Sequence, residues 1–192
     1  MKQGYLVPFG LALLLLLARA YLSSAGSTPA GQPALAHMDD VARLKAQFND
    51  SASRMRVVIL LSASCPYCLK GASAVQRILE SHPQHSIVVH VVWQPILPTD
   101  WGLPGSGALS RLSDSRVQQF WDPEHAVARA LEQSVRGREP QPGCCFTRGI
   151  WWDMMAVYPP GAVWTDTLPP PLLLDGTVDE AAPAFDAVLN AR

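Results

Sequence analysis

The sequence predicts an α/β fold with a central sheet flanked by helices, and three observations support this. Residues 56–62 and 87–93 are apolar and rich in β-branched side chains, which is typical of parallel strands buried on both faces. Between them, residues 65–81 carry apolar side chains at the helical spacing i, i+4, i+7 and i+11. These side chains are Cys68, Ala72, Val75 and Leu79. A strand, a helix and a second parallel strand form a βαβ unit, whose crossover is almost always right-handed.

The first residues, 1–22, have the pattern of a signal peptide or an N-terminal membrane anchor. Lys2 precedes an apolar stretch at residues 5–18, whose 14 residues fall short of the roughly 20 that span a bilayer. Small-residue cleavage patterns occur at residues 18–20 and 23–25, so release and anchoring both stay open. Either outcome places the domain outside the cytoplasm, periplasmic or secreted, where disulfides persist.

The rest of the chain divides into a flexible linker, residues 23–37, and a single domain, residues 38–192. The linker is rich in Ser, Ala, Gly and Pro. The further elements expected in the domain are, in chain order, a short amphipathic helix at 39–48, helices at 114–120 and 123–135, a short strand at 153–157, a strand at 172–174 and a terminal helix to about 189. Asp122 is the expected cap of the helix at 123–135, and residues 177–180 have the spacing of a capping box.

The motif Cys65-Pro66-Tyr67-Cys68 stands where the first strand meets the helix. A helix N-terminus carries partial positive charge and unpaired N–H groups, which stabilise a thiolate over a thiol. We therefore expect Cys65 to be exposed and acidic, with Cys68 one turn later and close enough to form a disulfide. Pro66 suits the first helical position. The motif predicts reversible thiol–disulfide chemistry in which Cys65 attacks and Cys68 resolves the mixed disulfide.

The order of these parts resembles the thioredoxin superfamily over roughly residues 54–189. Cys-Pro-Tyr-Cys is typical of glutaredoxins and occurs in some exported disulfide isomerases. The resemblance implies a thioredoxin-like central sheet with a long helical and loop insertion, about residues 94–165, between the second and third core strands. It also implies a cis-proline at the start of the third core strand, packed against the two cysteines. Pro170 matches best, six residues before Gly176, with Pro169 as the second choice and Pro171 beside them.

The chain departs from the family pattern at the position six residues before Cys65. Thioredoxins bury an acidic residue there, which helps to move the proton of the second cysteine, but this chain has Ile59. We therefore expect attack by Cys68 to lack this aid. The family's fourth strand also has no clear counterpart after residue 174, although the short strand expected at 153–157 is a candidate to replace it.

Cys144 and Cys145 are adjacent and follow a loop rich in proline and glycine. They could form a strained disulfide with each other, act as a second dithiol, bind a soft metal ion or pair with separate partners. The preferred hypothesis is a relay that passes disulfides to Cys65 and Cys68.

Other function classes are disfavoured. The 15 basic and 16 acidic residues balance, so no nucleic-acid partner is expected. The five histidines lack ligand or catalytic spacing, and no P-loop, dinucleotide fingerprint or catalytic triad is present. The sequence thus predicts an extracytoplasmic thiol–disulfide oxidoreductase that needs no cofactor, acts on protein thiols and disulfides, and is reset by a redox partner. It would also contact the membrane if its N-terminus stays uncleaved. The alternatives are a soft-metal-binding module that uses both cysteine pairs and a noncatalytic interaction domain.

Overall fold

The computed structural model describes residues 10, 26–100, 102–137 and 144–191. The predicted signal or anchor at residues 1–22 lies outside the described residues, apart from Gly10. Among the helices of the described part, none is both long enough and apolar enough to cross a bilayer.

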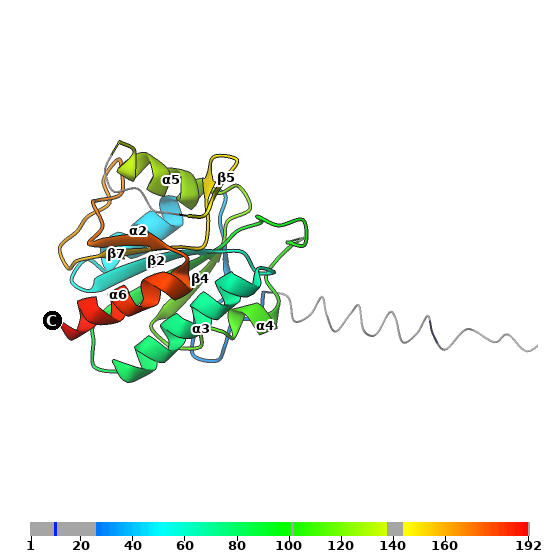
Figure 1. The fold of residues 1–192 in the computed structure, drawn as a ribbon, viewed down its shortest axis with the longest axis horizontal. Coiled ribbons are helices and arrows are strands. Elements are labelled where there is room, and N and C mark those ends of the chain that lie inside the picture. The colour runs from blue at the N-terminus through cyan, green and yellow to red at the C-terminus, as the bar shows by residue number, and fades with distance from the viewer. Residues whose placement is uncertain (1–9, 11–25, 101, 138–143, 192) are drawn as a thin grey trace, which may run out of the picture.

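A six-stranded mixed sheet forms the middle of the molecule, in the order β1-β4-β3-β2-β7-β8 (Figure 1). The first four strands in this order are parallel to their neighbours, whereas β7 is antiparallel to β2, and β8 is antiparallel to β7. The strands are β1 (Ala36–His37), β2 (Met55–Leu61), β3 (Ile87–Trp93), β4 (Val117–Trp121), β7 (Met154–Tyr158) and β8 (Leu173–Gly176). A separate hairpin consists of β5 (Phe146–Thr147) and β6 (Ile150–Trp151).

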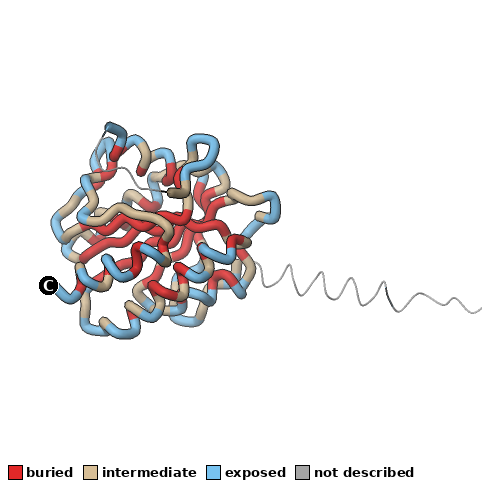
Figure 2. Tube along the Cα trace, in the orientation of Figure 1, coloured by how far each residue is buried: buried red, intermediate tan, exposed pale blue. Residues whose placement is uncertain are grey.

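Helices cover both faces of the sheet, as the α/β prediction requires. α3 (Pro66–Ser81) and α6 (Val178–Asn190) pack side by side on one face, and α2 (Ala42–Asp50) and α5 (Ala126–Val135) lie on the other (Figure 1). α4 (Ser106–Leu109) is a single turn after β3. The buried strands run as a continuous layer between more exposed helices (Figure 2). The central sheet flanked by helices confirms the predicted fold class.

Alternation along β2 divides the core into two clusters. Val57, Ile59 and Leu61 belong to the cluster beneath α3 and α6, here called the α3-side cluster. Val58 and Leu60 belong to the cluster beneath α2 and α5, here called the α2-side cluster. Successive side chains of a strand point to opposite faces, so every residue of this strand is buried.

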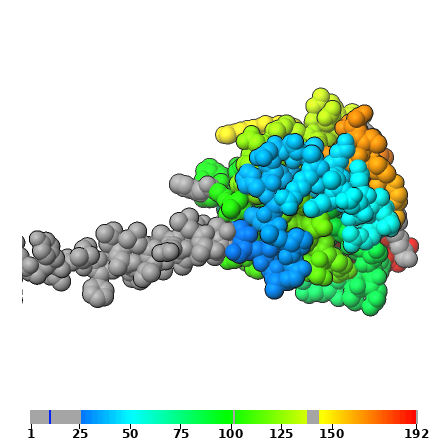
Figure 3. Space-filling model, turned by 180° about the vertical axis from the view of Figure 1, so that it is seen from behind, coloured from blue at the N-terminus to red at the C-terminus, as the bar shows by residue number. Residues whose placement is uncertain are grey.

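The α2 face also carries the segment that leads into β8. Asn49 at the end of α2 donates to the carbonyl oxygen of Trp164 at 3.0 Å and accepts from its backbone N–H at 2.8 Å. Figure 3 shows this face, with α2 in blue and residues 160–170 in orange. These bonds connect a loop without regular structure to a helix 115 residues away.

The sequence interpretation of residues 114–120 as a helix is wrong, because residues 117–121 form β4. This strand pairs in parallel with β3 along its whole length. The segment predicted as an insertion, residues 94–165, therefore contributes both β4 and β7 to the central sheet. Strand pairing over such distances depends on the partner strand and overrides local preference.

Candidate active site

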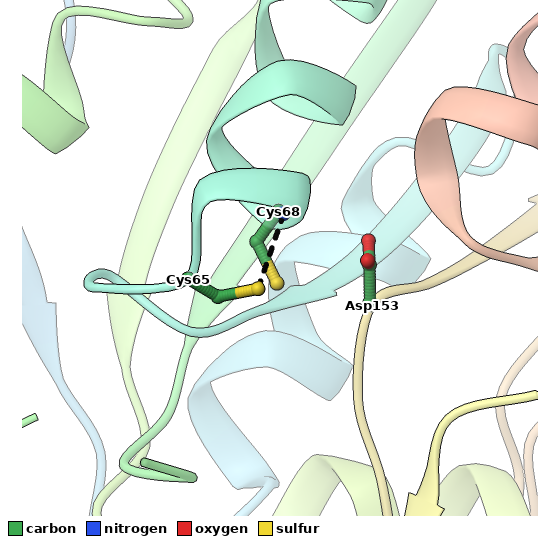
Figure 4. A group of neighbouring side chains, drawn as sticks. All are labelled: Cys65, Cys68 and Asp153. Carbon is green, nitrogen blue, oxygen red and sulfur yellow. Dashed lines mark hydrogen bonds between the residues drawn. The ribbon is translucent and has the colours of Figure 1, made fainter. Parts of the chain in front are cut away.

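Cys65 and Cys68 lie where β2 passes into α3, both as free thiols (Figure 4). Cys65 is the N-cap residue of α3, and its sulfur accepts a hydrogen bond from the backbone N–H of Cys68 at 3.5 Å. The backbone N–H of Ser62 donates to the Cys68 sulfur at 3.4 Å. Pro66 occupies the first turn, as the sequence predicts. The two sulfurs thus face each other at the positive end of a helix.

The expectation that Cys65 is exposed is wrong. Only 3% of Cys65 and 0% of Cys68 is exposed, and both belong to the α3-side cluster. Leu97 and Trp152, which come from different loops, pack against the same cluster. The exposed residue of the motif is Tyr67, at 70%. The loop after β3 and the segment before β7 pack near the start of α3. The spacing of apolar residues within the helix cannot predict this burial, because the covering segments lie elsewhere in the sequence.

Asp153 is the third chemical group of the site. It is 1% exposed and stands directly before β7, with its carboxylate on the α3 side of the sheet (Figure 4). One carboxylate oxygen accepts the backbone N–H of Val178 at 3.1 Å. The two cysteine sulfurs and a carboxylate oxygen of Asp153 all lie within 4.8 Å of one another. Asp153 is therefore a buried acid beside the cysteines, which Ile59 cannot provide at the position expected from the sequence.

Burial and charge act on this group of side chains together. Burial raises the pKa of the Cys68 thiol well above its ordinary value, and the nearby Asp153 carboxylate raises it further. Burial also raises the pKa of Asp153, against the opposing hydrogen bond from Val178. In this site Cys68 is therefore a protonated thiol beside the carboxyl group of Asp153.

Asp100 holds the loop after β3 against the cysteine motif. Its carboxylate accepts the Ser62 hydroxyl at 2.8 Å and the backbone N–H of Ser64 at 3.0 Å. It also accepts the backbone N–H groups of Ile96 and Leu97, both at 2.9 Å. Burial acts to raise the pKa of Asp100, but these hydrogen bonds outweigh burial, so its pKa lies below the ordinary value. An ionised carboxylate therefore anchors the rim of the site.

The assignment of Pro170 as a cis-proline beside the cysteines is wrong. Among the described residues the cis peptide bond is Gly176–Thr177, so the bonds before Pro169, Pro170 and Pro171 are trans. These prolines precede β8 at the edge of the sheet, whereas β7 lies next to β2. Asp153, at the start of β7, takes the place beside the cysteines. The sequence did contain a signal, because Asp153 is an acid within the otherwise apolar run of residues 150–157.

Cys144 and Cys145 form a disulfide with each other. Cys145 packs against the α2-side cluster, whereas Cys65 and Cys68 belong to the α3-side cluster. A Cβ added to Gly176 would lie 3.3 Å from the Cys144 sulfur and 2.6 Å from the carbonyl oxygen of Asp153. The disulfide therefore lies near the strand ends that carry Asp153, although Cys145 packs against a different core cluster from Cys65 and Cys68. The relay between the two cysteine pairs stays a prediction.

A cleft of about 360 Å³ lies between the loop after β3 and the β5–β6 hairpin. Its lining includes Leu97, His125, Arg148 and Ile150. Leu97 also packs against the cluster that contains the cysteines, so the cleft adjoins the rim of the site.

No family model and no curated protein matches the chain. Among solved structures, it is similar to a secreted Mycobacterium tuberculosis disulfide oxidoreductase homologous to E. coli DsbE, at 9% identity over 77% of this chain and 86% of that one, with a TM-score of 0.40. A second is MTB DsbF, at 14% identity over 74% and 84%, with a TM-score of 0.40. A third is the thioredoxin domain of a thiol-disulfide oxidoreductase from Bacteroides vulgatus, at 10% identity over 71% and 81%, with a TM-score of 0.38. At these identities and TM-scores, the similarity assigns neither a family nor a function to this chain.

Proposed function

We propose that this chain is an extracytoplasmic thiol–disulfide oxidoreductase that exchanges disulfides with protein thiols through Cys65 and Cys68. The observation that carries the proposal is the free thiol pair at the N-terminus of α3, with Cys65 as the N-cap residue. Backbone N–H groups directed at both sulfurs favour thiolate formation as each sulfur reacts.

The exchange proceeds in two steps that conserve electrons and protons. In the first step the Cys65 thiolate attacks one sulfur of a substrate disulfide, the substrate S–S bond breaks, and the second substrate sulfur leaves as a thiolate. In the second step Cys68 gives its proton to Asp153 and attacks the Cys65 sulfur, so the mixed disulfide breaks and the first substrate sulfur leaves as a thiolate. Two electrons pass from the cysteine pair to the substrate, and the proton on Asp153 passes to solvent. A redox partner then reduces the Cys65–Cys68 disulfide, and oxidation of a substrate dithiol runs the same steps in reverse.

Burial of Cys65 sets a condition on this exchange. Because only 3% of Cys65 is exposed, the residues that cover it must move aside before a substrate sulfur reaches it. Trp152 is held to the hairpin by the hydrogen bond from its indole N–H to the Thr147 hydroxyl at 3.2 Å, and to Cys145 through its backbone N–H at 2.9 Å. These two hydrogen bonds attach the residue before Asp153 to the β5–β6 hairpin and to the disulfide beside it.

Location outside the cytoplasm is part of the same proposal. The apolar pattern of residues 1–22 supports export, and the Cys144–Cys145 disulfide supports an oxidising compartment. Membrane attachment follows if the segment stays uncleaved.

Covalent trapping tests the proposal. The variant Cys68→Ser should accumulate mixed disulfides between Cys65 and protein partners, seen as bands that reductant removes on non-reducing gels. The matched variant Cys65→Ser should trap none, and the wild-type protein should reduce insulin disulfides. Absence of trapped species from Cys68→Ser, together with absence of insulin reduction, would reject the proposal. The burial of Cys65 favours a second candidate function, a noncatalytic interaction domain. Absence of both trapping and insulin reduction would support this second candidate.

A further inference from the structure

We propose that the reduced site binds a zinc ion through Cys65, Cys68 and Asp153. This state goes beyond disulfide exchange and needs only that the two thiols are reduced. The three side chains come from different places in the chain. Cys65 is the N-cap residue of α3, Cys68 lies in its first turn, and Asp153 directly precedes β7. Figure 4 shows the three side chains near one another.

The geometry is close to that of a metal site. A sulfur from each cysteine and a carboxylate oxygen of Asp153 lie within 4.8 Å of one another, and all three residues are buried. Zn–S bonds of about 2.3 Å and Zn–O bonds of about 2.0–2.2 Å place tetrahedral ligands about 3.5–3.8 Å apart. Small rotations of the side chains therefore suffice to bring the ligands to an ion.

The ligand types select among metals. Two thiolates exclude Mg²⁺ and Ca²⁺, which prefer oxygen ligands, and a carboxylate beside them fits the borderline Zn²⁺ better than Cu(I). Three protein ligands leave the fourth tetrahedral position open to water or to an external thiol. The metal-binding alternative drawn from the sequence needed free thiols at Cys144 and Cys145, which are bonded to each other.

Each candidate ligand already accepts a hydrogen bond from the backbone. Cys65 accepts from Cys68 at 3.5 Å, Cys68 from Ser62 at 3.4 Å, and Asp153 from Val178 at 3.1 Å. Outer N–H donors of this kind orient ligands and stabilise their anionic forms in metal sites. The N–H group of Val178 binds one of the two carboxylate oxygens of Asp153.

Two further carboxylates lie near the proposed ligands, and one of them is paired with a lysine. Asp179 and Glu180, in the first turn of α6, place further negative charge near Asp153. The ammonium of Lys70 pairs with Asp179 at 2.7 Å on the surface. Two thiolates and a carboxylate repel one another when buried together, and a divalent ion removes that repulsion.

Metal binding and disulfide formation use the same electron pairs of sulfur. The Cys65–Cys68 disulfide therefore cannot hold zinc, and the zinc-bound pair cannot attack a substrate until the ion leaves. Zinc would thus protect the reduced site from oxidation and alkylation.

Cobalt(II) as a spectroscopic probe for zinc tests the inference on the full chain, reduced and kept free of oxygen. Wild-type protein should bind one equivalent with a near-ultraviolet thiolate-to-cobalt band, and added Zn²⁺ should abolish the band. Asp153→Asn should weaken binding at least tenfold, and Cys65→Ser should lower the band intensity to about half. The control Asp179→Asn removes a nearby negative charge without removing a ligand, so it should retain affinity within about threefold. Far-ultraviolet circular dichroism would confirm that each variant is folded.

Binding without the thiolate band would overturn the inference, as would equal affinity in wild type and a folded Asp153→Asn variant. Insulin reduction by wild type and trapping by Cys68→Ser, both measured with a chelator present, test disulfide exchange independently of metal binding. Exchange without cobalt binding rejects the zinc site alone. Asp153-dependent cobalt binding without trapping supports the zinc site and rejects the oxidoreductase.

Discussion

The contact between α3 and α6 makes the substitution Gly71→Ala a direct test of how the site is positioned. A Cβ at residue 71 would lie 2.8 Å from the Cβ of Val178 and 3.0 Å from the backbone nitrogen of Asp179. Neither atom is the end of a flexible side chain, so α6 must move away from α3. Val178 also donates the hydrogen bond that holds Asp153, and this movement therefore reaches the active site.

The magnitude follows from two opposing effects. Alanine in place of glycine within a helix gains about 1 kcal/mol. Overpacking of a tight contact costs about 1–3 kcal/mol, and the present contact is shorter than real Cβ contacts, so the upper part of that range applies. We therefore expect the free energy of unfolding to fall by about 1–2 kcal/mol.

Urea unfolding followed by circular dichroism measures this change, provided that the slope with urea is the same in both proteins. The matched control is Gly107→Ala in α4, where no atom lies within 4 Å of the added Cβ. The control should leave stability unchanged or raise it by up to about 1 kcal/mol. A Gly71→Ala protein as stable as wild type would refute the close contact between α3 and α6.

Three more predictions follow from groups around the sheet. Burial lowers the pKa of His90 to about 3, so between about pH 6.5 and pH 3 the folded state binds fewer protons than the unfolded state. The free energy of unfolding should therefore fall as the pH falls through this window, by up to about 1.4 kcal/mol per pH unit. Urea unfolding at pH 7 and pH 5 should therefore show a smaller loss for His90→Phe than for wild type, and equal losses would contradict this. Asp100→Ala leaves four hydrogen-bond donors without their carboxylate, so it should lower the free energy of unfolding by about 2–4 kcal/mol. It should also speed alkylation of Cys65, and unchanged alkylation would show that Asp100 does not hold the loop after β3 over the site. Replacing both Cys144 and Cys145 by serine should leave insulin turnover within about twofold, because Cys145 packs against a different core cluster from Cys65 and Cys68. A large loss of turnover would instead support the relay.

The βαβ unit around the cysteine motif could be predicted because its signals are local. The alternation of strand and helix periods fixes β2, α3 and β3, and the Cys65 cap with Pro66 fixes where α3 begins. The start of α6 could also be predicted, because Thr177 and Glu180 have the spacing of a capping box. In the structure Thr177 is the N-cap residue, and its hydroxyl accepts the backbone N–H of Glu180.

The errors have one physical origin, which is pairing between distant segments. Residues 114–120 are predicted as a helix, but residues 117–121 form β4 because β3 offers a free parallel edge. Pro170 was matched to the wrong strand because a linear motif does not say which strand lies beside β2, and β7 occupies that place.

The sequence by itself determined the thiol pair, the helix that begins at it and the α/β class, because hydrophobic periodicity and helix capping act within a few residues. Only the tertiary structure decided that Asp153 is the acid of the site, that Cys65 is covered, and that Cys144 and Cys145 bond to each other. Those outcomes depend on which strands and loops meet across the sheet, and the free energy that selects them comes from burying side chains far apart in the chain.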